Sequence, residues 1–315
     1  MRLAVSMGDS AGVGPELCVR AALAPEFSGV QFRFYGAQSV LDESFRRWGE
    51  GRTAPPVAFD AGLKFGDVPV GAADARCGKA AYDALTAAVE DVKCGDCAAL
   101  VTAPMNKYSV NLAGIPFTGH TERIAELCGV SDFAMLQSTG GLRVIFATTH
   151  IPIAEVSKQL TKERIVLVSK LLADAIREEG IASPKLAAAA LNPHAGENGC
   201  MGHEENDTVI PALEELRAAG VAIDGPYPPD VMFIERIRSR YDGLVAMYHD
   251  QGHIPVKMLA FDSCVNSTLG IPVIRTSPDH GTAFDIAWRG RADTGSFFAA
   301  VRLALRRAAN RGGAR

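Results

Sequence analysis

Each of three short apolar runs in this chain ends close to a histidine, and these histidines are His150, His194 and His249. The runs begin at Leu142, Leu186 and Leu244, and each reads as a buried strand. In an open α/β sheet, ligands bind beyond the carboxyl ends of the strands. Three imidazoles there can hold one divalent cation and still leave positions for a substrate. We therefore predict a metal site formed by the three histidines; the alternative is three separate histidines at loop starts.

A polar segment, residues 249–257, continues from the third histidine. Asp250 is placed to orient a metal-binding imidazole through its second ring nitrogen. Lys257 follows Pro255 and offers a positive charge for an anionic group, or a group for proton transfer. We predict Asp250 and Lys257 as catalytic residues. His253 is a fourth possible ligand, although we expect it in a solvent-facing loop.

Two further segments carry donors for an anion. Residues 117–122 form a glycine turn that brings His120 and Thr121 to the start of a helix, where free amides bind phosphate; alternatively, Thr121 only caps the helix. Arg275 is predicted at the end of a strand, where its planar guanidinium can clamp an anionic group, with a structural salt bridge as the alternative. Asn266 is a neutral donor nearby in the sequence.

Two loops are candidates for a nucleotide cofactor. In residues 8–16 a strand leads into a glycine turn, and Pro15 suits the first position of the following helix. The helix amides there favour an anion, but the spacing matches neither the Rossmann fingerprint nor a P-loop. Residues 279–285 form a small polar loop that suits an adenine or a ribose. The predicted cofactor-binding residues are Gly12, Gly14, His280, Gly281, Thr282 and Asp285.

The elements that position these residues alternate between short apolar runs and longer amphipathic ones. This alternation predicts an α/β fold with mainly parallel strands and crossover helices. The 315 residues suit two lobes rather than one core. We predict a cofactor-side lobe of residues 1–120 with 265–315, and a middle lobe of residues 121–264 that carries the metal ligands.

The composition narrows the class of function. A net charge of −4 without a basic stripe gives no indication of nucleic-acid binding, and no apolar stretch has the length of a membrane span. Seven scattered cysteines favour reduced thiols and a cytoplasmic enzyme. No serine or cysteine nucleophile with a neighbouring base emerges, so we expect metal-assisted chemistry in which a cofactor carries the difficult step.

The motifs together resemble those of the 4-hydroxythreonine-4-phosphate dehydrogenases of vitamin B6 (pyridoxal phosphate) biosynthesis, the PdxA family. The matching blocks are residues 12–16, 113–122, 147–152, 191–197, 246–252, 265–270 and 274–283. The resemblance implies a two-lobed fold like that of isocitrate and isopropylmalate dehydrogenases, with an interdomain cleft. It also implies a homodimer whose active sites take residues from both subunits, NAD or NADP as cofactor, and Zn, Mg or Co as metal.

Within that resemblance, the metal ligands fall on the same three histidines. The substrate contacts fall on His120, Thr121, Lys257, Asn266 and Arg275. The implied reaction is the oxidation and decarboxylation of a phosphorylated 3-hydroxy acid, 4-phospho-hydroxy-L-threonine. These five residues would supply several donors for an anion, which argues against the unphosphorylated substrates of the related dihydrodiol dehydrogenases.

Some residues depart from the usual family pattern. Ser10 stands where proline is common, and Trp288 stands where glycine is expected, which places cofactor geometry in question. Residues 253–257 look more like the branch that oxidises D-threonate or D-erythronate 4-phosphate in sugar-acid catabolism. That branch is the first alternative function, and an acyl transferase resembling phosphotransacetylase is the second.

Overall fold

The computed structural model describes residues 1–313, which divide into two compact units. The first unit comprises Met1–Ser131 with Ile271–Ala309, and the second comprises Asp132–Gly270 with the chain end from Asn310. The lobe boundaries expected from the sequence remain a prediction, and residues 314 and 315 at the end of the first lobe lie outside the described residues. The predicted α/β class with mainly parallel strands is confirmed.

The first unit contains five parallel strands in the order β3-β2-β1-β4-β11. Their bounds are β1 Arg2–Ser6, β2 Gln31–Gly36, β3 Phe59–Asp60, β4 Leu100–Thr102 and β11 Arg275–Pro278. The central strand β1 buries both of its faces, as parallel sheets covered by crossover helices do. The helices are α1 Gly14–Leu23, α2 Gln38–Trp48, α3 Ala75–Lys93, α4 Lys107–Leu112, α5 His120–Cys128 and, starting in this unit, α12 Gly295–Gly313.

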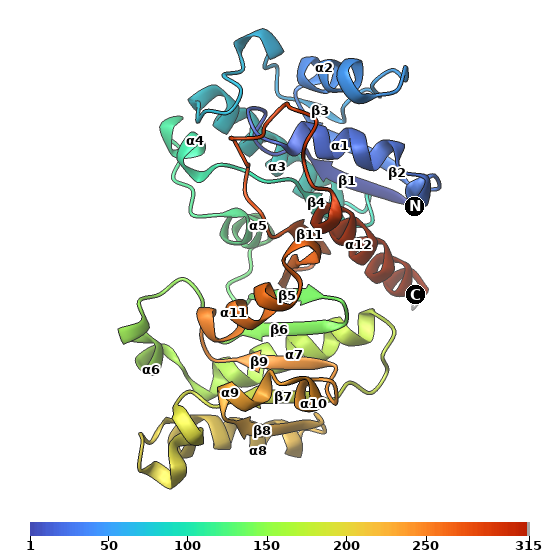
Figure 1. Cartoon of the computed structure of the whole chain (residues 1–315). Helices are drawn as coiled ribbons and strands as arrows, with labels where there is room; N and C mark the ends of the chain where they lie inside the picture. Colours follow the sequence, from blue (N-terminus) through green and yellow to red (C-terminus); the bar gives the residue numbers. More distant parts are fainter. Residues whose placement is uncertain (314–315) are drawn as a thin grey trace. The chain divides into compact units, whose positions relative to one another are not determined.

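The second unit contains six strands in the order β10-β5-β6-β9-β7-β8. Figure 1 labels all of them except β10. Their bounds are β5 Ala134–Thr139, β6 Leu142–Phe146, β7 Leu186–Ala189, β8 Ile223–Tyr227, β9 Gly243–Ala246 and β10 Val265–Leu269. Strand β5 runs antiparallel to β10 and β6, and the other pairs are parallel. A hairpin turn joins β5 to β6, with Gly140 and Gly141 at φ of 50° and 93°, as two adjacent glycines between apolar runs favour.

Helices cover both faces of the sheet in the second unit. They are α6 Val156–Gln159, α7 Lys162–Glu178, α8 Ile210–Ala218, α9 Pro229–Met232, α10 Glu235–Arg238 and α11 His249–Ala260. Successive strand residues face opposite sides, so Ile145 packs in the cluster with α7 and α8, whereas Val144 and Phe146 pack in the cluster with α9 and α11. Among the described helices, none is both long and apolar enough to cross a membrane.

Candidate active site

The strand order explains how the sequence gathers its histidines at one edge. Strands β6, β9 and β7 are adjacent and parallel, so their carboxyl ends lie at the same edge of the sheet (Figure 1). His150, His249 and His194 follow these three strands. The hydrophobic strands thus position the segments that carry the imidazoles, as the sequence predicts for an open α/β sheet.

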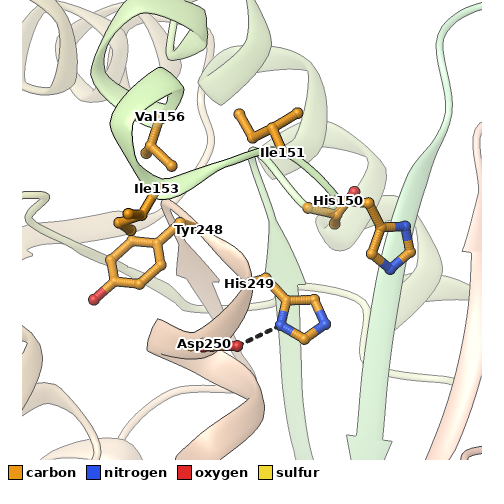
Figure 2. Close-up of a pocket in the computed structure, with 8 residues that line it drawn as sticks. His150, Ile151, Ile153, Val156, Tyr248, His249 and Asp250 are labelled. Atoms are coloured by element: carbon orange, nitrogen blue, oxygen red, sulfur yellow. Dashed lines mark hydrogen bonds and ion pairs between the residues drawn. The ribbon is translucent and has the colours of Figure 1, made fainter.

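Two of the three histidines form a close pair. The rings of His150 and His249 lie with their centroids 5.7 Å apart (Figure 2). Nδ1 of His249 lies 2.6 Å from Oδ1 of Asp250, the contact that the sequence suggests. A proton on Nδ1 leaves the lone pair of Nε2 available, which is the form that binds a metal. The pocket at this pair is lined by Thr149, His150, Ile151, Ile153, Val156, Tyr248, His249 and Asp250.

The third histidine lies in an irregular loop. His194 is exposed, and its φ of 53° lies in the left-handed region. Within the part of the chain that the structure describes, no three His, Cys, Asp or Glu side chains are grouped so as to hold a metal ion. The structure of one chain therefore shows the pair of His150 and His249, and the three-histidine site remains a prediction.

His253 lies against His249 rather than in a solvent-facing loop, so that expectation is wrong. The reason is that α11 continues through Pro255, which places His253 in a buried turn of the helix. Its ring stacks on Phe146 at 4.4 Å and on His249 at 3.9 Å. Burial, and then the neighbouring His249, lowers the pKa of His253 to about 3. A neutral ring therefore supports the His249 imidazole.

Arg275 is a buried cation of the first unit. The prediction that Arg275 ends a strand is wrong, because Arg275 is the first residue of β11. The apolar residues before it belong to the turn that follows Gly270, so the strand begins later than the sequence pattern indicates. The side chain is 4% exposed, and its Nε and Nη2 lie 3.2 and 2.8 Å from Oγ1 of Thr102. Burial lowers the pKa of Arg275 to about 10, and Glu122 opposes that shift. The guanidinium stays charged at neutral pH.

His120 lies at the start of α5, near this guanidinium. The N-cap of α5 is Gly119 and no side chain caps the helix, so the alternative in which Thr121 serves as the cap is wrong. His120 donates to the carbonyl of Ala103, and its Nε2 has no hydrogen-bond partner in the described structure. Burial, followed by Arg275 and Lys107, holds the pKa of His120 well below its usual value. The free Nε2 is therefore a hydrogen-bond acceptor at neutral pH.

The remaining predicted substrate contacts belong to the second unit. Lys257 is an exposed residue of α11, and Asn266 is a half-buried residue of β10. Their contact with a substrate stays a prediction.

The two predicted cofactor segments contact each other within the first unit. The backbone N–H of Val13 donates to the carbonyl of Thr282 at 3.0 Å, and a Cβ at Gly12 would lie only 2.8 Å from the same oxygen. A Cβ at Gly14 would lie 2.1 Å from the carbonyl oxygen of Met7. The glycines are therefore required for close packing. His280, Gly281 and Asp285 remain partly or fully exposed on their loop.

Sequence reasoning missed the polar side chains that fix the segments around the histidines. Gln251 accepts from the N–H of Met247 at 2.6 Å and donates to the carbonyl of Ala190 at 2.8 Å, which joins the ends of β9 and β7. Glu205 is buried and accepts from the N–H groups of Leu191 and Asn192, before the His194 loop. The sequence signal for this role was the polar residue Gln251, which directly follows His249 and Asp250 at the end of an apolar run.

The chain is similar to known proteins along nearly its whole length. Residues 33–304 match the family model described as pyridoxal phosphate biosynthetic protein PdxA. The chain is 39% identical to D-threonate 4-phosphate dehydrogenase of Salmonella typhimurium, over 96% of this chain and 98% of that protein. It is 42% identical to 4-hydroxythreonine-4-phosphate dehydrogenase of Chromobacterium violaceum, over 98% of each.

Solved structures show the same similarity. The crystal structure of 4-hydroxythreonine-4-phosphate dehydrogenase from Klebsiella pneumoniae has a TM-score of 0.82 and 38% identity, covering 98% of this chain and 99% of that one. Isocitrate dehydrogenase from Methylococcus capsulatus has a TM-score of 0.53 at 16% identity, and a branched-chain phosphotransacylase from Enterococcus faecalis has 0.57 at 12%. These last two likenesses concern the fold alone.

Proposed function

Since the chain belongs to the PdxA family of pyridoxal phosphate biosynthetic proteins, we propose that it is a metal-dependent dehydrogenase that oxidises and decarboxylates 4-phospho-hydroxy-L-threonine. NAD or NADP accepts the hydride in this proposal. The observation that carries it is the His150–His249 pair with Asp250 behind it, in a chain that also buries Arg275 beside Thr102. These are donors for a divalent cation and for a phosphate.

The imidazole pair fits a divalent ion because both rings present nitrogen donors and one is already oriented by a carboxylate. His150, His194 and His249 would hold Zn, Mg or Co. When bound, such an ion lowers the pKa of a substrate hydroxyl and stabilises the negative charge that develops as carbon dioxide leaves. Asp250 keeps the His249 tautomer, and Lys257 is proposed to transfer a proton.

The phosphate is assigned to the buried cluster of the first unit. Arg275 is held by Thr102 and stays charged, so its guanidinium is already oriented for an anion. His120 offers a free Nε2 for a hydroxyl or a protonated phosphate oxygen. Thr121 and Asn266 complete the proposed substrate contacts. Fixing the phosphate holds the reacting carbon in place for hydride transfer, which supplies part of the rate. The proposed cofactor contacts are Gly12, Gly14, His280, Gly281, Thr282 and Asp285.

A second candidate keeps the chemistry and changes the substrate to D-threonate or D-erythronate 4-phosphate. It is supported by residues 253–257 and by the relative named D-threonate 4-phosphate dehydrogenase. The acyl-transferase alternative has only the fold likeness behind it, and that reaction makes no use of paired histidines beside a carboxylate.

We further propose that the enzyme is a cytoplasmic homodimer with shared active sites. Its seven cysteines are free thiols. Large apolar side chains are exposed at Ile153, which lines the histidine pocket, and along α11, which begins at His249, and a second copy would bury them: Ile153, Ile254, Met258 and Leu259 are 71, 56, 82 and 48% exposed. Because no third ligand groups with His150 and His249 in the described part of one chain, we assign the His194 ligand to the second copy.

One assay tests the proposed function. The purified protein, supplied with Zn, Mg or Co, is offered each of the three 4-phosphorylated acids while NADH or NADPH absorbance is followed. Reduced cofactor formed with 4-phospho-hydroxy-L-threonine is the expected result, and a preference for the threonate or erythronate ester selects the second candidate. His249→Ala should lose turnover and metal retention together, as measured by elemental analysis. If none of the acids reduces either cofactor, the proposed function is wrong.

A further inference from the structure

Arg275 alone leaves part of the negative charge of a bound phosphate uncompensated. A phosphate monoester carries about −1.5 to −2 charges at neutral pH. Arg275 supplies a single positive charge, and Glu122 lies close enough to act on it electrostatically. Neighbouring Thr102 is uncharged, and burial keeps His120 neutral. A second cation at this cluster would balance the remaining charge.

Lys107 is the cation in position to supply that charge. Together with Arg275, it is one of the two positive groups that act on His120. A Cβ at Gly119, the N-cap of α5, would lie 3.7 Å from Nζ of Lys107 and 2.7 Å from Oε2 of Glu122. The ammonium therefore lies at the uncapped N-terminus of α5, close to the segment that carries His120. The partial positive charge of the helix terminus adds to this attraction for an anion.

The backbone beneath Lys107 is fixed, whereas its side chain is exposed. Lys107 is the first residue of α4, and the cap of that helix is Asn106, whose side chain accepts from the N–H of Ser109 at 2.9 Å. The preceding loop is tied to the first glycine turn, because Asp9 donates its backbone N–H to the carbonyl of Pro104 at 2.9 Å. A flexible ammonium on a rigid base can approach a ligand without disturbing the fold.

We propose that Lys107 is a phosphate-binding residue of the substrate site, with its ammonium neutralising the charge that Arg275 leaves uncovered. This inference rests on the proposed function, because it takes the phosphorylated substrate from there. Arg275 and Lys107 have distinct roles. The buried guanidinium is a fixed fork that sets the position of the phosphate, and the exposed ammonium closes on it as a mobile point charge.

The first test compares Lys107→Gln with Lys107→Arg in steady-state kinetics with the phosphorylated acid that the wild type uses. We expect the glutamine variant to raise KM about 10- to 100-fold while kcat changes less than about 3-fold, because the lost charge binds substrate and transition state alike. The arginine variant should recover most of the affinity. Lys79→Gln is the matched control: Lys79 is on α3, pairs with Asp83 and is 63% exposed, so it removes the same charge elsewhere. A KM for Lys107→Gln within about twofold of the control overturns the inference.

The second test separates this inference from the proposed function. Binding of inorganic phosphate to the intact protein is measured by calorimetry for the wild type, Lys107→Gln and Lys79→Gln. Weaker phosphate binding in Lys107→Gln alone supports the role of Lys107, even if no phosphorylated acid is oxidised and the proposed function fails. Equal phosphate affinity in all three proteins contradicts it, whatever the activity, and so does an absence of measurable phosphate binding to the wild type.

Discussion

A buried carboxylate, Asp9, lies beneath the first glycine turn and has a distinct electrostatic signature. Its side chain is fully buried, with Oδ1 accepting from the N–H of Ala11 at 3.0 Å. Burial raises the pKa of Asp9 above its usual value, and the hydrogen bond from Ala11 opposes that rise. Asp74, the N-cap of α3, shows the opposite behaviour, since its hydrogen bonds with Arg76 lower its pKa. The two carboxylates should therefore give stability profiles of opposite sign.

We expect Asp9→Asn to become more stable relative to the wild type as pH rises. A carboxyl group with a raised folded pKa contributes stability below its unfolded value near 3.8 and loses it as pH rises through the folded value. The asparagine keeps an oxygen for the N–H of Ala11 and has no charge to bury. Melting temperatures of both proteins between about pH 4 and 7 measure the difference, within the range where such groups titrate.

Asp74→Asn is the control of opposite sign. Its carboxylate has a lowered folded pKa, so it contributes stability above about 3.8 that is lost as pH falls. This variant should therefore become less stable relative to the wild type as pH rises from about 2 to about 5, and should change little above that range. A flat or falling difference for Asp9→Asn between about pH 4 and 7 would mean that burial does not raise the pKa of Asp9.

At the scale of single residues, contacts between neighbours in the chain could be predicted from the sequence, whereas contacts between distant residues could not. The pairing of Asp250 with His249 follows from adjacency in the chain, so it could be anticipated. The contact of Thr102 with Arg275 joins residues that are far apart in sequence and depends on the parallel pairing of β4 with β11. Such contacts are set by strand order, which a single sequence does not reveal.

At the scale of elements, Ser10 and Trp288, the two residues that depart from the family pattern, contact each other. Nε1 of Trp288 donates to the backbone carbonyl of Ser10 at 2.9 Å, and the indole is 7% exposed. Its ring packs against Phe65 at 4.5 Å and Trp48 at 5.4 Å. The φ of Trp288 is 60°, a left-handed conformation that costs a bulky residue about 1–2 kcal/mol. Packing must therefore outweigh this strain.

We expect Trp288→Gly to destabilise the protein although glycine suits the backbone. Removing a buried tryptophan side chain costs about 3–5 kcal/mol, whereas relief of the left-handed conformation returns about 1–2 kcal/mol. The net loss in the free energy of unfolding should be about 2 kcal/mol, measured by urea denaturation. Trp288→Phe keeps a ring but loses the hydrogen bond to Ser10, so it should lose less. A glycine variant as stable as the wild type would show that the strain dominates.

The sequence pattern indicates where some helices begin but not where every helix ends. Thr161 caps α7 by accepting from the N–H of Arg164, as the preference of threonine for the N-cap position favours. By contrast, α11 was hidden because Pro255 normally ends a helix, yet here it lies inside one. Packing of α11 against β5 and β6 outweighs the hydrogen bond that Pro255 cannot donate. This packing depends on the strand order, which a single sequence does not reveal.

At the scale of the whole molecule, the proposed metal site is the feature that one chain leaves incomplete. His150 and His249 are paired in the described structure, but no third candidate ligand joins them there. Strand order places His194 after the neighbouring strand β7, and its exposed loop is accessible to a second copy. The three histidines as ligands stay a prediction from the sequence, and strand periodicity had no means of assigning them to one subunit or two.

Subunit complementation tests that assignment. His194→Ala and His249→Ala are each expected to be inactive, because each removes one metal ligand from every site of its homodimer. If His194 serves the partner's site, a mixed dimer has one site that lacks both ligands and one site that is intact. Unfolding the two variants together and refolding them should therefore restore about a quarter of the wild-type activity, as random pairing makes half of the dimers mixed and each of these has one intact site out of two.

Co-refolding each variant with itself is the control and should restore nothing. If His194 instead binds metal within its own chain, every site of the mixed dimer lacks a ligand, so mixing restores no activity either. Size-exclusion chromatography of the refolded mixture shows whether dimers have formed, and metal content per dimer gives a second readout. Dimers without recovered activity would assign all three histidines to one subunit.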